Sequence, residues 1–346
     1  MSRSLPFALA FIVPLLSGLA VVLGGWALLL PPAFLFVITP VMDSLLGKET
    51  GNLEENADRW RDLRYDAWLW LWIPAQLAIQ VGALVVASRT TDPASLVGLV
   101  FASGLLGGVG LNVAHEFMHR KGKPERAIAE VLCASVGYTH FCVEHVLGHH
   151  KHVATPEDPA TARKGESLAP FLLRSIVGGV RSYWQLEGAR VRKLSIPFGL
   201  RDRRVRYPLM LALVVGAIGV ELGPVALAVF VGQCVVGVLL LETINYLEHY
   251  GLARRAIEGG YERVEPAHSW SSAHRLTSFY LFLLPRHADH HAHASRPYFA
   301  LRHIDDSPQL PAGYSTMLVL ALVPPLWRRV MDPRVDAWNL RTRESS

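Results

Sequence analysis

Cysteine is scarce in this chain of 346 residues, which contains only Cys133, Cys142 and Cys234. No two of them have the C-x2-C spacing of a thiolate metal site, so the sequence predicts no fused four-cysteine iron module. Three cysteines also give no basis for a disulfide framework. A G-x-G-x-x-G fingerprint for binding a dinucleotide is missing as well. The sequence therefore contains no recognisable electron carrier of its own.

Charged residues are rare over six long segments, and 51% of the chain is hydrophobic. The six apolar segments are residues 5–23, 26–46, 67–87, 93–113, 207–220 and 224–246. A helix needs about 20 such residues to cross a hydrocarbon core about 30 Å thick. We therefore predict an all-α integral membrane protein in which residues 1–346 form a single domain with six transmembrane helices. The segment 207–220 is short and would have to extend toward Val205.

Basic residues are nearly absent from one set of connections between these segments. If the N-terminus is cytoplasmic, the outer connections are residues 24–25, 88–92 and 221–223, and they contain one basic residue, Arg89. The other 33 of the 34 Lys and Arg lie on the inner side, which is the positive-inside pattern. We therefore expect both termini and the segments 114–206 and 247–346 to be cytoplasmic. The pattern also accounts for the net charge of +5, so we expect membrane lipid and no nucleic acid as a partner.

Histidine, in contrast, is frequent, with 15 residues and none before position 115. Nine of them have metal-ligand spacing in four segments. NVAHEFMHRK (112–121) contains His115 and His119, EHVLGHH (144–150) contains His145, His149 and His150, NYLEHYGL (245–252) contains His249, and PRHADHHAH (285–293) contains His287, His290 and His291. Residues four apart share a face of a helix. We therefore expect His145 and His149 to point the same way, with His150 beside them.

A single histidine at a helix end, such as His249, is more often a hydrogen-bonded core residue than a ligand, but four groups together predict a metal site. The sequence HEFMH also fits the H-E-x-x-H motif of metalloproteases, with Glu116 as general base. A zinc protease uses three protein ligands and one open position, whereas nine histidines suit two metals at four or five ligands each. In that case Glu116 would orient a ligand histidine. Spacing alone does not choose among iron, copper, zinc and nickel.

The motifs HEFMH, EHVLGHHKHVATPEDPATARKGE, NYLEHYGL and LPRHADHHAHASRPYFALR closely resemble those of the membrane alkane monooxygenases. These belong to a wider group of histidine-rich di-iron hydroxylases and desaturases. The resemblance runs from about Asp43 to MDPRVDAW (331–338) and implies a protein of the inner membrane. It also implies that the nine histidines hold two non-haem iron ions, and that one oxygen atom of O2 enters the terminal methyl group of n-alkanes or related hydrocarbons.

The resemblance further implies a separate rubredoxin or ferredoxin, with its reductase, as electron donor. The basic residues expected to dock it are Arg120, Lys121, Lys123, Arg126 and residues 201–204. The chain departs from the family at four positions. Where this chain has Pro285, members of the family usually have glutamine. Where it has Val146, Ser271 and Ala273, they usually have asparagine. These departures indicate a divergent subfamily and leave the substrate and its chain length open.

Three other functions stay open at this point. An acyl-lipid desaturase or another di-iron oxygenase could use the same scaffold, although desaturases typically have an H-x2-H-H second box and this chain has H-x3-H-H. A metal transporter or sensor without catalysis should place polar ligands in mid-membrane, whereas these lie at the inner ends. A membrane metalloprotease is the third alternative, on the HEFMH motif alone.

Two further sets of residues in the spans are candidates for function. Glu242 lies seven residues before His249, so both face the same side of a helix about 10 Å apart. Because an acid inside a membrane is costly, we expect Glu242 to bond a ligand histidine or to line the site, with a packing role as the alternative. Gly104, Gly108 and Leu111 continue the face of His115 for about 16 Å. They predict either close helix packing or a narrow apolar slot for a linear hydrocarbon.

Overall fold

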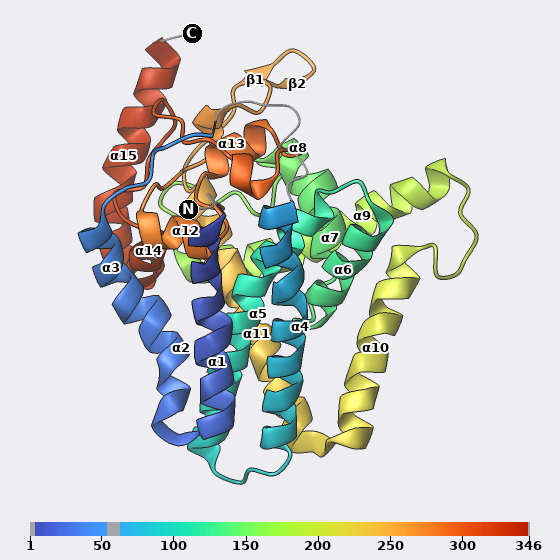
Figure 1. Cartoon of the computed structure of the whole chain (residues 1–346). Helices are drawn as coiled ribbons and strands as arrows, with labels where there is room; N and C mark the ends of the chain where they lie inside the picture. The colour runs from blue at the N-terminus through green and yellow to red at the C-terminus, as the bar shows by residue number, and fades with distance from the viewer. Residues whose placement is uncertain (1–3, 54–62, 345–346) are drawn as a thin grey trace.

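The computed structural model describes residues 4–53 and 63–344, and helices dominate it. Long helices form a bundle, and a layer of shorter elements covers one end of it (Figure 1). The strands of the described residues are β1 (Ala256–Ile257) and β2 (Gly260–Tyr261), which form one small antiparallel hairpin. The prediction of an all-α protein is confirmed.

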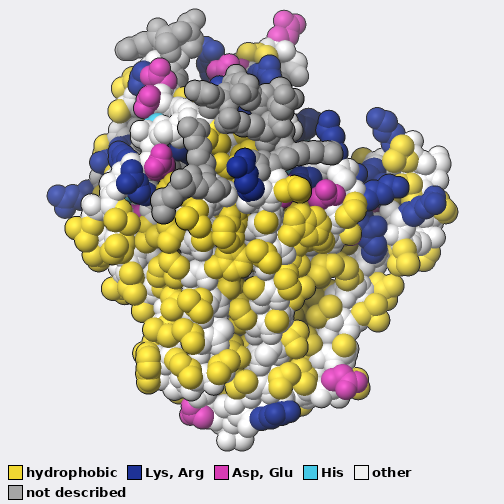
Figure 2. Space-filling view, in the orientation of Figure 1, with side chains coloured by type: hydrophobic (Ala, Val, Ile, Leu, Met, Phe, Trp, Pro, Cys, Tyr) yellow, Lys and Arg dark blue, Asp and Glu magenta, His cyan; other side chains and the backbone are white. Residues whose placement is uncertain are grey.

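Five stretches of the described helices are long and apolar enough to cross a membrane. The first consists of η1 (Leu5–Phe11) and α1 (Ile12–Leu23). The second consists of four consecutive pieces, η2 (Gly25–Leu29), α2 (Leu30–Ala33), η3 (Phe34–Ile38) and α3 (Thr39–Leu46). The other three are single helices, α4 (Leu63–Ala87), α5 (Pro93–Met118) and α11 (Gly223–His249). Apolar side chains cover the body of the bundle, and charged side chains gather at its two ends (Figure 2). This distribution is typical of a protein embedded in a bilayer.

The sixth predicted span, 207–220, lies within α10 (Arg203–Glu221). This helix is not among those that are long and apolar enough to cross a membrane. The helix begins with three arginines in its first turn, Arg203, Arg204 and Arg206, after an N-cap at Asp202. It ends at Glu221, so charges at both ends shorten its apolar part. The helix nevertheless packs along α11 in the bundle. The count of six spans is therefore not confirmed.

The layer at the end of the bundle carries the histidine-rich segments. It consists of α6 (Lys123–Ala134), α7 (Phe141–Glu144), η5 (His145–His149), α8 (His150–His152), α9 (Leu168–Lys193), η6 (Pro266–His268), α12 (Arg275–Tyr280), α13 (His287–Ala292), η7 (Tyr298–Ala300), α14 (Tyr314–Ala321) and α15 (Pro324–Glu344). Buried polar bonds tie it to the N-terminal spans. Arg286 donates to the carbonyl oxygens of Leu301 (2.7 Å) and Gly51 (2.9 Å), and Asp43 accepts from the Thr277 backbone N–H (3.0 Å). These bonds fix the position of α13.

Close contact between α5 and α11 brings the two histidine-bearing helix ends together. A Cβ added at Gly104 would lie 2.6 Å from Val236 Cβ, and one added at Gly108 would lie 2.8 Å from Leu240 Cδ2. Small residues allow such an approach in membrane helices. The space beside these glycines, where the sequence also allowed a hydrocarbon slot, is filled by α11, and Leu111 is fully buried. The geometry favours the packing alternative for Gly104 and Gly108.

We predict that Gly104→Ala destabilises the protein, because the new methyl group would overpack the α5–α11 contact at a cost of about 1–3 kcal/mol. Gly216→Ala on α10 is the matched control, since a Cβ there meets no atom within 4 Å. Thermal unfolding in detergent should show a lower midpoint for Gly104→Ala only. Equal midpoints together with a changed preference for hydrocarbon length would instead support a slot at Gly104.

Candidate metal centre

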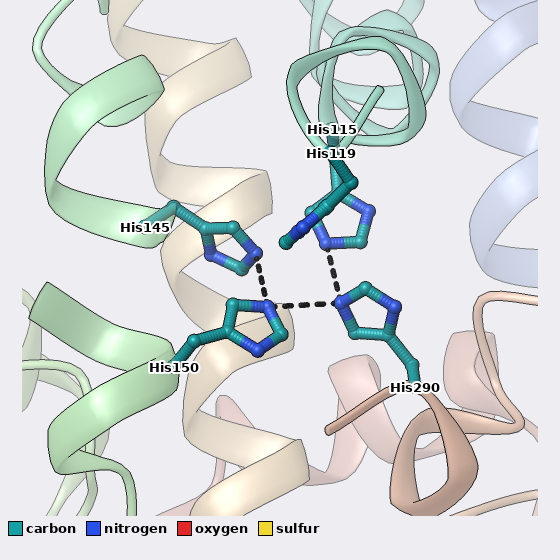
Figure 3. A group of neighbouring side chains, drawn as sticks. All are labelled: His115, His119, His145, His150 and His290. Atoms are coloured by element: carbon teal, nitrogen blue, oxygen red, sulfur yellow. Dashed lines mark hydrogen bonds between the residues drawn. The ribbon is translucent and has the colours of Figure 1, made fainter. Parts of the chain in front are cut away.

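All nine histidines with ligand spacing come together in two adjacent groups. One group contains His115, His119, His145, His150 and His290, and the other contains His149, His249, His287 and His291. Within each group the potential ligand nitrogens all lie within 4.8 Å of one another. The five side chains of the first group converge from three segments of the chain (Figure 3). Each group is of a size that could hold one metal ion.

A short π-helix decides how the histidines of EHVLGHH divide between the groups. Residues 145–149 form η5, in which hydrogen bonds connect residues five apart rather than four. His145 and His150 therefore align, with their Nε2 atoms 3.0 Å apart. His149 turns toward the other group. The expectation that His145 and His149 share a face is thus wrong, because it assumed α-helical periodicity.

The helix α13 lies between the two groups and contributes to both. His287 and His291 are four residues apart on one face, and their Nε2 atoms are 2.9 Å apart. His290 faces the other way, with its Nε2 2.9 Å from that of His115 and 3.0 Å from that of His150. The rings of His150 and His291 stack across the boundary at a centroid distance of 4.4 Å. The two groups therefore share a wall of imidazoles.

The spacing of the nitrogens fits metal coordination better than hydrogen bonding. A metal–imidazole bond measures about 2.0–2.1 Å, so two ligands at right angles lie about 3 Å apart. A neutral imidazole has only one donor and one acceptor, yet His290 Nε2 faces two other Nε2 atoms. The Nε2 atoms of His119 and His149 are buried and have no hydrogen-bond partner in the part of the chain that the structure describes. These donor atoms fit two metal ions.

The electrostatics of the groups favour the neutral form of the ring that binds metals. Burial, together with neighbouring imidazoles, lowers the pKa values of five histidines well below their usual value: His145, His150, His287, His290 and His291. Burial also lowers the pKa of His119 to about 4. Because a metal ligand must present a lone pair, these shifts prepare the site for a cation.

His149 differs because a carboxylate holds its second nitrogen. Burial disfavours its protonated form, but Asp158, whose Oδ2 lies 2.9 Å from His149 Nδ1, raises the pKa of His149 above its usual value. Asp158 is itself fixed by the Thr161 hydroxyl (2.6 Å) and the Ala160 backbone N–H (3.0 Å). The contact keeps a proton on Nδ1 and leaves Nε2 directed at the other histidines of its group, as outer carboxylates do in metal sites.

Sequence reasoning missed Asp158 and also Glu248. The Glu248 carboxylate lies 3.2 Å from His287 Nε2 and accepts a hydrogen bond from the Tyr314 hydroxyl at 2.8 Å. No spacing rule connects Asp158 with His149, because a turn folds the chain back between them. Glu248 directly precedes His249, and an acid next to a candidate ligand was the one available signal.

The structure places Glu116 away from the role that the sequence suggested. Its carboxylate accepts from Arg120 at 3.2 Å, and Arg120 also donates to Asp66 on α4 at 2.8 Å. Glu116 therefore helps to tie the end of α5 to α4, and its side chain bonds Arg120 rather than a histidine. The general base of a metalloprotease would have to face the metal held by the histidines. This geometry therefore gives the metalloprotease hypothesis no support.

Glu242 lines the edge of the site without bonding a histidine of either group in the described structure. It accepts hydrogen bonds from Tyr138 (2.7 Å), Ser175 and Asn245. With His145 and His149 it borders an enclosed cavity of about 10 Å³, which is room for about one water molecule. Glu242 thus lines the site rather than bonding a ligand histidine, and its bonds to Tyr138 and Ser175 also fit the packing role that the sequence left as the alternative.

The remaining six histidines lie outside both groups. His140 is next to Tyr138. The other five each contact a polar side chain: His152 contacts Glu157, His268 contacts Glu262, His274 contacts Ser272, His293 contacts Asp289 and His303 contacts Asp305.

Ser271 is one of the positions where related proteins usually have an asparagine. Its hydroxyl accepts a hydrogen bond from the backbone N–H of Ala288 in α13 at 3.0 Å. Ser271 therefore still supports the helix that carries three of the nine histidines.

Known proteins resemble this chain over most of its length. Residues 93–321 match the family model described as fatty acid desaturase. The chain is 44% identical to alkane 1-monooxygenase 1 of Pseudomonas aeruginosa, over 90% of this chain and 84% of that protein. It is 40% identical to alkane 1-monooxygenase 2 of Alcanivorax borkumensis, over 88% and 82%. It is 27% identical to the xylene/toluene monooxygenase hydroxylase component of Pseudomonas putida, over 72% and 68%.

We predict that His149→Ala and His290→Ala each lower the bound metal and abolish activity, because each removes a ligand from a different group. The matched control is His152→Ala, which changes a histidine of the same segment that belongs to neither group. Metal analysis of the purified variants measures the effect. Full metal content and full turnover in either ligand variant would refute the assignment.

Proposed function

The chain belongs to the alkane monooxygenase group within the fatty acid desaturase family, and on that premise we propose that it hydroxylates the terminal methyl group of n-alkanes or related hydrocarbon chains with O2. We propose that two non-haem iron ions are its cofactors. His115, His119, His145, His150 and His290 would hold one ion, and His149, His249, His287 and His291 the other. The division of nine imidazoles, seven of them buried and two half-buried, into groups of five and four is the observation that carries this proposal.

The residues of the chain explain why such a site suits this reaction. An aliphatic C–H bond offers no acid, base or leaving group, so bound iron would supply the O2 chemistry that side chains lack. The histidines provide neutral nitrogen ligands in a buried environment that limits the access of water. Asp158 orients His149 through Nδ1, and Tyr314 holds Glu248 beside His287. The Asp158 contact keeps the His149 ring in one orientation, whereas the Glu248 carboxylate faces the same nitrogen of His287 that would bind iron.

We further propose that Glu242 is a positioning residue at the edge of this site. It connects Tyr138, which follows α6, with Ser175 on α9 and Asn245 on α11. Three elements that surround η5 are thereby joined at one carboxylate. Glu242 would thus keep the enclosed cavity next to His145 and His149 polar and of constant shape.

The reaction also defines the partners that we propose. Converting a hydrocarbon and O2 to an alcohol and water consumes two electrons and two protons. The three cysteines are free thiols and do not form a four-cysteine iron site, so a separate rubredoxin or ferredoxin with its reductase would supply the electrons. From the distribution of basic residues we place both termini and the metal site on the cytoplasmic side of the inner membrane.

We predict that the iron-loaded protein, supplied with rubredoxin and its reductase, converts n-alkanes of graded length to 1-alkanols. Isotopically labelled O2 should deliver one labelled oxygen atom to the alcohol, which mass spectrometry of the products detects. His290→Ala serves as the inactive control. An alkene as product would favour the desaturase alternative, and no product at any chain length would refute the proposal.

A further inference from the structure

An open pocket of about 580 Å³ lies between α9 and the segment 152–163. Three arginines line it, Arg163, Arg174 and Arg181, against one acidic residue, Glu157. Arg174 is held in place, since it donates to Glu166 (2.7 Å) and to the carbonyl oxygens of Pro159 and Thr161 (3.0 Å each). Arg163 and Arg181 are exposed. The pocket therefore presents two exposed guanidinium groups to any partner that enters it.

The floor of this pocket is close to the metal centre. Pro159 lines the pocket and also lines the enclosed cavity that touches His145 and His149. It packs tightly on α9, because a Cβ added at Gly178 would lie 2.6 Å from Pro159 Cβ. A single proline side chain thus contributes to the wall of both spaces.

A short path of covalent and hydrogen bonds connects Pro159, at the floor of the pocket, with the group of four histidines. Pro159 is covalently bonded to Asp158, and Asp158 Oδ2 lies 2.9 Å from His149 Nδ1. One peptide unit and one hydrogen bond therefore link the pocket to an imidazole of the site. Electron tunnelling falls steeply with distance and is attenuated less through bonds than through empty space. This path therefore favours electron entry from the pocket.

Three of the basic residues that the sequence suggested for docking already have acidic partners within the chain. Arg120 is paired with Glu116 and Asp66, Arg203 with Glu187, and Arg204 with Asp202. Their charges are already matched within the chain. Lys121, Lys123 and Arg126 are exposed as well. Arg163 and Arg181 differ from them because they line a pocket that shares Pro159 with the cavity at the histidines, so carboxylates bound there would hold a partner close to the site.

The exposed apolar residues and the arginines of α9 lie on different faces of the helix, so the arginines can meet a soluble partner rather than lipid. Its exposed apolar residues Leu173, Val177 and Trp184 follow one helical stripe. Arg174 and Arg181 lie about 100° and 80° around the helix from Leu173, at 100° per residue. The apolar stripe can meet hydrocarbon while the arginine face meets water.

We propose that this arginine pocket is the docking site of a separate, acidic electron-transfer protein. The proposal rests on the proposed function, because a monooxygenase needs two external electrons in each turnover. The partner would place its carboxylates on Arg163 and Arg181 and its redox centre over Pro159.

The test is the double variant Arg163→Glu/Arg181→Glu in the full-length, iron-loaded protein. The control is Arg329→Glu/Arg334→Glu, which changes the same charge on α15, on the opposite side of the molecule (Figure 1). Alkane oxidation is measured with reduced rubredoxin at low and high salt. It is measured again in a single turnover, in which the protein is reduced with dithionite without oxygen, excess dithionite is removed, and O2 is then added. We expect the pocket variant to raise the KM for rubredoxin about tenfold or more and to lose the salt dependence seen in wild type. Its turnover with dithionite and its iron content should match the control.

Three results would overturn the proposal. If the pocket variant and the control respond equally to rubredoxin, the donor docks elsewhere, and the hydroxylase function stands because wild type is active. If turnover with dithionite falls as much as turnover with rubredoxin, the arginines serve the site itself or bind a lipid phosphate. If wild-type protein oxidises no alkane with either reductant, the proposed function fails and the docking proposal fails with it.

Discussion

The structure depends on the convergence of nine imidazoles in a buried space. Their Nε2 atoms approach one another to 2.9–3.2 Å, although neutral imidazoles cannot satisfy one another at that density. Cations that accept the lone pairs would resolve this conflict. The rest of the layer above the bundle serves to hold the rings in place: the π-turn at 145–149, the central helix α13, and the carboxylate of Asp158.

The membrane helices contribute to the site directly, because two of them run on into it. α5 carries His115 in its last turn, and α11 ends at His249. The close approach at Gly104 and Gly108 sets the distance between these helices. A packing defect deep in the bundle would therefore be transmitted to both groups of histidines. Stability of the bundle and geometry of the site are coupled through this one contact.

Much of this arrangement could be predicted from the sequence, and the failures have physical causes. The nine histidines could be found because ligand spacing and the clustering of a rare residue type are local signals. Their division into five and four could not be found, because it depends on a π-turn that shifts His149 relative to His145. The partners Tyr138 and Ser175 of Glu242 come from other segments of the chain, and helix periodicity gives only the direction of a side chain. The apolar segment 207–220 lacks the length that made the other spans recognisable.

The central claim is that each group of histidines holds one iron ion. The most direct measurement is the anomalous scattering of crystals of the iron-loaded protein at the iron absorption edge. The account predicts two peaks per chain, one among His115, His119, His145, His150 and His290 and the other among His149, His249, His287 and His291. A single peak, or a peak outside these groups, would contradict it.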